Sequence, residues 1–410
     1  QKNKSRVHFY FYTTKFKKMN SPIIKFILVS LLLFSCQTPE LESSDSLTTP
    51  EEKLINSQNY YTFSKQIMSA LANGTFDRPA PYTFRDVDAI KIVYKTENYD
   101  GEEIVTSGVL LLPKIDGSLP ILSFHHGELL KTGKAPSESI TGANDLTYAA
   151  LIASTGLAVL VPDYIGYGNS SQHWHPFEHK ATLVKNSYDM YLASKEYLTQ
   201  QKIKTNSKLY LTGFSEGGIA TLGVQRFLEE QTTINVTKTI VGNGAFAKVI
   251  WAKQLLSSPQ NPEKIRYFAR MVHSYNIIYP ELDRPWNYYF NDAFMDLESN
   301  IDHVMELPQM VDHPEALFTP LFIKSVLDES DTTFLRVLKE NQIEGWPAKA
   351  SIYFFRGSED RIWSATQTHL AAQAIENKGG TVKQKVLIGE DHKSMIGPFV
   401  EEVLKQVYYE

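Results

Sequence analysis

The chain has 410 residues, of which 42% are hydrophobic and 21% charged, so it can bury a full core in one large domain or two smaller ones. Its formal net charge of −5 at pH 7 and the lack of a long basic run in its main body argue against nucleic-acid binding. Cys36 is the only cysteine, which excludes a disulfide within the chain and a cysteine-based metal site.

Residues 19–36 have the pattern of a secretory signal. A short segment ending in Lys25 is followed by an apolar run from Phe26 to Phe34, which is too short to span a bilayer as a permanent helix. The segment Leu33-Phe34-Ser35-Cys36 resembles the lipobox of bacterial lipoproteins, which implies cleavage before Cys36 and a lipid on its thiol. We therefore expect a protein anchored to a membrane of the bacterial cell envelope through Cys36. The alternative is an ordinary signal peptide and a secreted protein.

Composition divides the chain into five parts. We interpret residues 1–36 as a leader and lipoprotein signal peptide, and residues 37–58, which begin with a Ser/Thr/Pro/Glu-rich segment, as a disordered tether. Strand and helix patterns alternate over residues 59–244 and 348–410. Residues 245–347 show helical patches, prolines and many aromatic residues, and they predict a helical cap. The cap aromatics could line an acyl or aryl pocket, or could simply pack the cap's own core.

The alternation predicts an α/β fold with a mostly parallel, doubly wound sheet and a site at the carboxyl ends of its strands. In chain order, strands are expected over residues 88–96, 104–112, 120–124, 156–161, 209–211, 236–241, 351–355 and 382–388. Helices are expected over residues 60–72, 145–154, 180–199, 219–230, 365–377 and 395–408.

The segment after the predicted strand 209–211 places a serine in a tight turn before a helix. Gly213-Phe214-Ser215-Glu216-Gly217 fits the pattern Gly-x-Ser-x-Gly. Glycines are needed there because the turn strains the serine backbone, and a side chain at either glycine would collide with the neighbouring strand or helix. The turn exposes the serine Oγ beside the first N–H groups of the helix. We interpret Ser215 as a nucleophile; the alternative is a glycine-rich turn with an incidental serine.

A serine hydroxyl needs a base, and the base needs an orienting acid. Candidates follow in the last two strand-to-helix loops. We predict that Asp360 is the orienting acid, and Glu359 is the alternative. Either residue could also be a solvated loop residue. His392 is our base, rather than a surface or helix-capping histidine. His392 would take the proton of Ser215, and Asp360 would hold the tautomer of the imidazole and stabilise the imidazolium.

The loop His125-His126-Gly127-Glu128 follows the predicted strand 120–124. Because Gly127 allows close backbone approach, we expect the oxyanion hole to be formed by the backbone N–H groups of Glu128 and Glu216. His125 and His126 could instead suggest a metal site. Adjacent residues at a strand end point to opposite faces, however, and no third ligand is evident. We therefore predict no metal and no cofactor.

Several segments together resemble the secretory lipase-like α/β-hydrolases, which include bacterial esterases. They are His126-Gly127, Ala135-Pro136-Ser137, the run from Pro162 to Gly168, His175-Pro176-Phe177 and the run from Gly213 to Gly218. The resemblance extends roughly from Ile90 to the C-terminus and is weakest in the cap. It implies the α/β-hydrolase fold, ester hydrolysis through an acyl-enzyme, and a helical lid over the site.

We therefore predict a membrane-tethered serine carboxylesterase or lipase that acts on a small-molecule or lipid ester. His126, Gly127 and Tyr164 are expected to contact the substrate, while Asp163 could shape the site or tie loops together. The alternatives are a serine peptidase on the same fold and a lipoprotein that binds without catalysis.

Glu128 and Glu216 depart from the pattern that the resemblance leads us to expect. Both would add negative charge near the pocket, and we expect that charge to disfavour acidic substrates.

Overall fold

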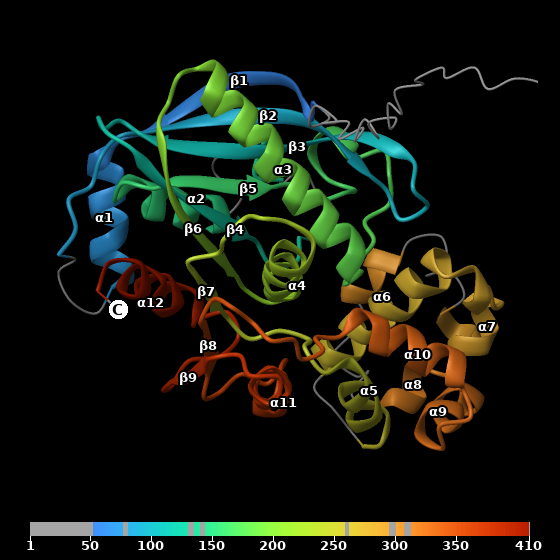
Figure 1. Ribbon diagram of the computed structural model, residues 1–410. Helices are drawn as coiled ribbons and strands as arrows, with labels where there is room; N and C mark the ends of the chain where they lie inside the picture. The colour runs from blue at the N-terminus through green and yellow to red at the C-terminus, as the bar shows by residue number, and fades with distance from the viewer. Residues whose placement is uncertain are drawn as a thin grey trace, which may run out of the picture. The chain divides into compact units, whose positions relative to one another are not determined.

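The structure is a computed structural model that describes residues 52–76, 81–129, 135–139, 144–258, 262–294, 301–306 and 313–409. Its centre is a nine-stranded sheet with the order β1-β2-β3-β5-β4-β6-β7-β8-β9 (Figure 1). The strands are β1 (Leu54–Phe63), β2 (Val87–Glu97), β3 (Glu103–Pro113), β4 (Leu119–His125), β5 (Ala158–Pro162), β6 (Thr205–Gly213), β7 (Lys238–Val241), β8 (Ile352–Gly357) and β9 (Val382–Leu387).

Strand direction divides the sheet into two parts. The neighbours β1/β2, β2/β3 and β3/β5 are antiparallel, whereas all pairs from β5 through β9 in the sheet order are parallel. The carboxyl ends of six strands therefore meet at one edge, where loops can bring distant residues together. The prediction of a mostly parallel sheet with helices on both faces is confirmed.

Helices cover both faces of the sheet (Figure 1). One face packs against α1 (Lys65–Thr75), α2 (Asn144–Ser154) and α12 (Ile396–Tyr408). The other packs against α3 (Lys180–Gln200), α4 (Glu216–Gln231) and α11 (Ala365–Glu376). The central strands are therefore buried on both sides, which explains their continuous apolar runs.

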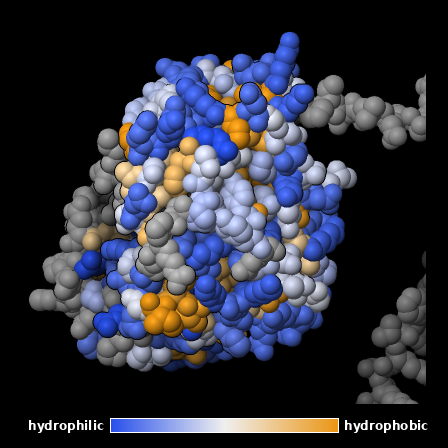
Figure 2. Space-filling model, turned by 90° about the vertical axis from the view of Figure 1, so that its left-hand side faces the viewer, coloured by the Kyte–Doolittle hydropathy of each residue, from blue (hydrophilic) through white to orange (hydrophobic). Residues whose placement is uncertain are grey.

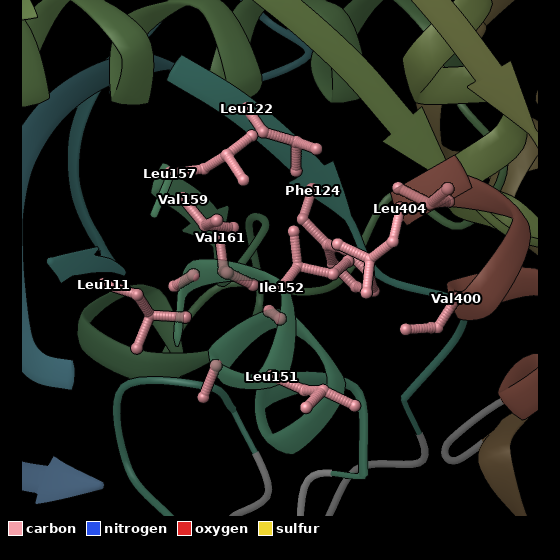
Figure 3. Packing of buried hydrophobic residues seen from close by; sticks show 14 of the residues in the cluster. Leu111, Leu122, Phe124, Leu151, Ile152, Leu157, Val159, Val161, Val400 and Leu404 are labelled. Carbon is pink, nitrogen blue, oxygen red and sulfur yellow. The ribbon is translucent and has the colours of Figure 1, made fainter. Parts of the chain in front are cut away.

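Alternate residues of the central strands supply the two halves of the core. Leu122 and Val159 face α2 and α12, and Figure 3 shows them in one cluster with Leu151 and Leu404 of those helices. Their sequence neighbours on the strands, such as Leu160, face α3 and α4. This two-residue alternation is the geometry of a strand.

The predicted helical insertion between β7 and β8 contains α5 (Lys248–Leu256), α6 (Pro262–Ile278), α7 (Trp286–Tyr289), α8 (Pro314–Leu317), α9 (Pro320–Leu327) and α10 (Thr332–Asn341). These helices enclose their own apolar cluster. Phe268 of α6 lies within it and contacts Phe318 at 5.4 Å and Trp251 at 5.5 Å between ring centroids. Most cap aromatics thus pack the cap itself, which was the simpler of the two interpretations.

The beginning of the described chain corrects two predictions. Residues 54–58, predicted as part of the tether, belong to β1, and the predicted helix 60–72 starts only at Lys65. The strand forms because the edge of β2 offers a pairing partner, and because the carboxylate of Glu196 on α3 accepts the N–H of Leu54 at 2.9 Å. The predicted signal, Cys36 and the tether up to residue 51 lie outside the described residues.

The side of the molecule that carries α1 and α12 is mostly hydrophilic. Figure 2 shows its apolar residues in small groups separated by hydrophilic ones. Exposed apolar side chains such as Ile67 on α1 are usual on protein surfaces when they are scattered. None of the helices in the described ranges is long and apolar enough to cross a membrane.

Replacing Phe268 by Ala should lower the free energy of unfolding by about 3–5 kcal/mol, because the change leaves a cavity in a fully buried aromatic cluster. The measurement is chemical denaturation followed by tryptophan fluorescence. Leu321→Ala in α9, where the side chain is 60% exposed, is the control and should change stability by less than about 0.5 kcal/mol. Equal effects of the two substitutions would contradict the packing described for the cap.

Candidate active site

Ser215 lies in the turn between β6 and α4 with a strained backbone, at φ 57° and ψ −123°. The flanking glycines are required as predicted. A Cβ on Gly213 would lie 2.3 Å from the carbonyl oxygen of Gly217, and a Cβ on Gly217 would lie 2.0 Å from that of His125. The turn is therefore possible only where these backbones approach each other without side chains between them.

The structure brings Ser215, His392 and Asp360 into one hydrogen-bonded row. Nε2 of His392 lies 3.1 Å from the Oγ of Ser215, and Nδ1 of His392 lies 2.9 Å from Oδ2 of Asp360. Because a carboxylate only accepts, Nδ1 carries the proton and Nε2 is free to accept the hydroxyl proton of Ser215. The rival acid Glu359 contacts Ser358 instead.

Asp360 is held by further donors in its own loop. Its Oδ1 accepts the backbone N–H groups of Ile362 at 3.0 Å and Trp363 at 2.9 Å. Burial alone would raise the pKa of Asp360. The neighbouring His392 and the hydrogen-bond donors outweigh burial and hold that pKa below its usual value. The carboxylate is therefore anionic at neutral pH.

Asn243, in the loop after β7, is a residue that the sequence analysis missed. Its side-chain amide donates to Oδ2 of Asp360 at 3.1 Å and to the carbonyl of Trp363 at 2.5 Å. Its own backbone carbonyl accepts the N–H of Ser215 at 2.9 Å. Asn243 thus joins the turn at Ser215 to residues 358–364, the loop that carries Asp360 and is called the acid loop below. The sequence feature that could have indicated Asn243 is its place between two glycines at the end of a buried strand.

Glu216 begins α4 and is buried beside Ser215. Its carboxylate accepts from Nε2 of His175 at 3.1 Å and from the N–H of Glu178 at 2.8 Å. Nδ1 of His175 donates to the carbonyl of Ile165 at 2.8 Å. Because both ring nitrogens of His175 donate hydrogen bonds, both carry a proton, and the imidazole is cationic. Burial would raise the pKa of Glu216, but His175 and the other donors outweigh burial and lower it.

Glu128 forms an ion pair with Arg270 of α6, and the two side chains are 8% and 4% exposed. The expectation that Glu128 and Glu216 add negative charge near the pocket is corrected by these two pairs, which neutralise both carboxylates. A buried carboxylate is stable only with a partner, and each of these two has a cationic one. His175 and Arg270 are distant in sequence from the glutamates that they neutralise, so no local pattern indicated the pairing.

A second buried ion pair joins the cap to the loop after β5. Lys248, the first residue of α5, pairs with Glu178, and both side chains are almost fully buried. The backbone of Glu178 is tied down as well, because its carbonyl accepts the hydroxyl of Tyr275 on α6 at 3.0 Å. The loop that positions the partners of Glu216 is therefore fixed by two cap helices.

The backbone of Gly127 lies against the nucleophile, since a Cβ on Gly127 would be 3.6 Å from the Cβ of Ser215. His126 and Tyr164, predicted to contact the substrate, are buried and support this loop. The Tyr164 hydroxyl donates to the carbonyl of His126 at 3.2 Å, and their rings lie 4.2 Å apart. Both side chains thus pack beneath the loop, and their contact with a substrate stays a prediction.

Two other residues near this loop are also structural. The carboxylate of Asp163 accepts from the hydroxyl of Ser107 at 2.5 Å and from the N–H of Ser137 at 2.9 Å, so it ties loops together. His125 uses both ring nitrogens on hydroxyl groups, those of Ser123 and Thr221. Burial, with the nearby His126, lowers the pKa of His125 to about 3. Within the described ranges, no group of three His, Cys, Asp or Glu residues could hold a metal ion.

A cleft of about 470 Å³ borders His392. Most of its lining is charged, and the residues around it are Glu263, Glu359, Arg361, Ile362, Gly389, Asp391 and Lys393. Two of them, Lys393 and Glu263 of α6, form an ion pair at 3.2 Å that links the last loop of the core to the cap. The cleft beside His392 is therefore hydrophilic.

Comparisons with known proteins agree with this architecture. Residues 144–235 match the prolyl oligopeptidase family. A Legionella pneumophila protein provisionally classed as a hydrolase superposes with a TM-score of 0.78 at 22% identity, over 88% of this chain and 99% of that one. The rice cell wall degrading esterase LipA from Xanthomonas oryzae gives 0.77 at 19% identity, over 86% and 97%. No curated protein matches the chain.

A more distant likeness is to lipase A of Candida antarctica in its closed state, with a TM-score of 0.60 at 15% identity, over 83% of this chain and 77% of that one. At such identities the likeness to the three solved structures concerns the fold. Together with the match of the central segment, it shows that the chain has the α/β-hydrolase fold.

Proposed function

We propose that the chain is a serine hydrolase that cleaves carboxylic esters, in the manner of a carboxylesterase or lipase. The observation that carries the proposal is the row Asp360–His392–Ser215, in which each hydrogen bond has the length and direction that nucleophilic catalysis requires. The strained turn at Ser215 and the ionised Asp360 add to its support.

In the proposed acylation, His392 takes the proton of Ser215 while Oγ attacks the ester carbonyl carbon. The oxyanion is stabilised by the backbone N–H groups of Glu216, at the start of α4, and of Glu128, next to Gly127. His392 then gives its proton to the leaving alcohol. In deacylation water takes the place of the alcohol, and His392 acts first as base and then as acid.

The leaving alcohol must lie on the His392 side, because His392 protonates it. The cleft on that side is lined mainly by charged residues. We therefore propose that the substrate has a polar alcohol portion, whereas its acyl portion lies between Ser215 and the cap.

The cellular setting that we propose rests on the sequence pattern around Cys36. A lipid on that thiol would anchor the enzyme to a bacterial envelope membrane. If the signal were cut without lipidation, the same enzyme would be secreted.

A serine peptidase is the second candidate, because residues 144–235 match the prolyl oligopeptidase family. The same three residues would then cleave an amide, and their arrangement alone does not distinguish the two reactions.

Replacing Ser215 by Ala should lower kcat/KM for short p-nitrophenyl esters by about ten-thousand-fold or more, because the nucleophile is lost. Fluorophosphonate labelling of the protein should disappear as well. Ser257→Ala, an exposed serine at the end of α5, is the control and should keep both activity and labelling. Unchanged turnover in a folded Ser215→Ala variant would refute the mechanism, and an unlabelled wild type would favour a non-catalytic binding protein.

The rate should fall in acid, because His392 must be neutral to accept the proton of Ser215. Asp360 does not cause this loss at mildly acidic pH, since its pKa is below the usual value and the carboxylate stays ionised there. The measurement is kcat/KM for an uncharged ester between about pH 4 and 9. A profile that stays flat down to the acid end would count against His392 as the base.

A set of substrates with one acetyl group should separate the candidate functions. We expect glycerol and sugar acetates to have a higher kcat/KM than octyl acetate, because the charged cleft favours a polar alcohol. Acetanilide, an amide with the same acyl group, should be slower than phenyl acetate by about a hundredfold or more. Faster cleavage of the amide would favour the peptidase, and a preference for octyl acetate would overturn the assignment of the cleft.

A further inference from the structure

The Oγ of Ser215 has a second neighbour besides His392. The indole Nε1–H of Trp363 donates a hydrogen bond to it, with 3.3 Å between the heavy atoms. Trp363 comes from the acid loop, where its backbone N–H binds Asp360 and its carbonyl accepts from Asn243. The segment that supplies the acid thus also supplies a donor to the nucleophile.

The indole ring is held in place on several sides. Its side chain is 2% exposed, and its centroid lies 4.8 Å from that of Trp251 and 6.2 Å from that of Tyr267, both in the cap. The ring of His392 lies 6.4 Å away, nearly perpendicular to it. The N–H cannot turn toward another acceptor without disturbing this packing.

The two hydrogen bonds at Oγ have different directions. An indole N–H can only donate, so Oγ accepts from Trp363 while its own proton goes to Nε2 of His392. A hydroxyl oxygen has two lone pairs. One lone pair accepts the hydrogen bond from Trp363, and the other lone pair remains for attack on a carbonyl carbon.

We propose that Trp363 is a further catalytic residue, whose indole N–H stabilises the Oγ of Ser215 when this oxygen is the leaving group of deacylation. The inference rests on the proposed function. In the step, water attacks the acyl carbon and gives its proton to His392. The bond between the acyl carbon and Oγ then breaks, its electron pair goes to Oγ, and His392 returns the proton to Oγ. The products are the carboxylic acid and the free serine.

The contribution of the donor differs between the two half-reactions. The Oγ of an acyl-enzyme is an ester oxygen, whose electron density is withdrawn by the carbonyl, so it accepts hydrogen bonds weakly. As the bond breaks, Oγ gains negative charge, and hydrogen bonds to charged acceptors are stronger. In deacylation the hydrogen bond from Trp363 strengthens toward the transition state, and it therefore accelerates that half-reaction. In acylation the same hydrogen bond weakens as the ester forms, and it therefore opposes that half-reaction. Trp363 should therefore speed deacylation and not speed acylation.

The test is the Trp363→Phe variant, which keeps an aromatic ring and removes the N–H. Stopped-flow measurement of p-nitrophenol release from p-nitrophenyl acetate gives acylation from the burst rate and deacylation from the steady state. We expect deacylation to slow by about tenfold, with acylation unchanged or faster, which is the effect of one lost hydrogen bond. Mass spectrometry should show acetylated Ser215 accumulating.

Trp251→Phe is the matched control. It makes the same change in volume next to Trp363, and the indole N–H of Trp251 has no acceptor among the described residues. A loss of packing would slow both steps, so the opposite behaviour of the two half-reactions distinguishes catalysis from structure. If Trp363→Phe does not fold, site-specific replacement of Trp363 by 3-benzothienylalanine keeps the ring shape and exchanges the N–H for sulfur.

Equal slowing of both steps in the Trp363 variant, or the same loss of deacylation in Trp251→Phe, would overturn the inference and leave the proposed function standing. If the wild-type protein shows no acylation by any ester, the proposed function fails, and the role of Trp363 fails with it.

Discussion

The site depends on the close approach of three backbones around Ser215. The serine adopts a positive φ only because β6, the start of α4 and the loop after β4 meet there without intervening side chains. This contact points Oγ toward His392 and places the first turn of α4 beside it. The loops of β8 and β9 reach the same point because their strands are parallel to β6 and end at the same edge. The strain is maintained by the core of the sheet, which is apolar on both faces.

Around this point the described residues include three buried ion pairs. Glu216 with His175, Glu128 with Arg270, and Glu178 with Lys248 each form a pair with little exposure to water. Buried pairs contribute little net stability, but the loss of one partner is costly. These pairs therefore position the loops near Ser215 rather than add much to the stability of the fold. Each pair connects one of these loops to another part of the core or to the cap. The environment of Ser215 thus contains charges that balance locally.

The fold and the hydrogen-bonded row of Ser215, His392 and Asp360 could be predicted from the sequence because their signals are local. A buried parallel strand is a short apolar run, and the nucleophile turn is five residues long with fixed glycines. Asp360 and His392 followed from their places after strands.

The supporting residues could not be predicted in this way. Asn243, Arg270 and Trp363 act through partners far away in sequence, and only the folded chain shows those partners. The edge strand β1 was missed because its polar sequence resembles a linker, and its pairing with β2 compensates for that polarity.

The ion pairs between cap and core also bear on how a substrate would reach the site under the proposed function. Arg270 on α6 binds Glu128 and lies 4.5 Å from the ring centroid of Phe177, while Lys248 on α5 binds Glu178. A lid that swings open at a lipid surface would have to separate both pairs in one movement and hydrate four charges. Any opening of α5 and α6 away from the core would therefore carry the cost of breaking both pairs. The proposed function would then favour substrates that reach the site without such a movement of the cap.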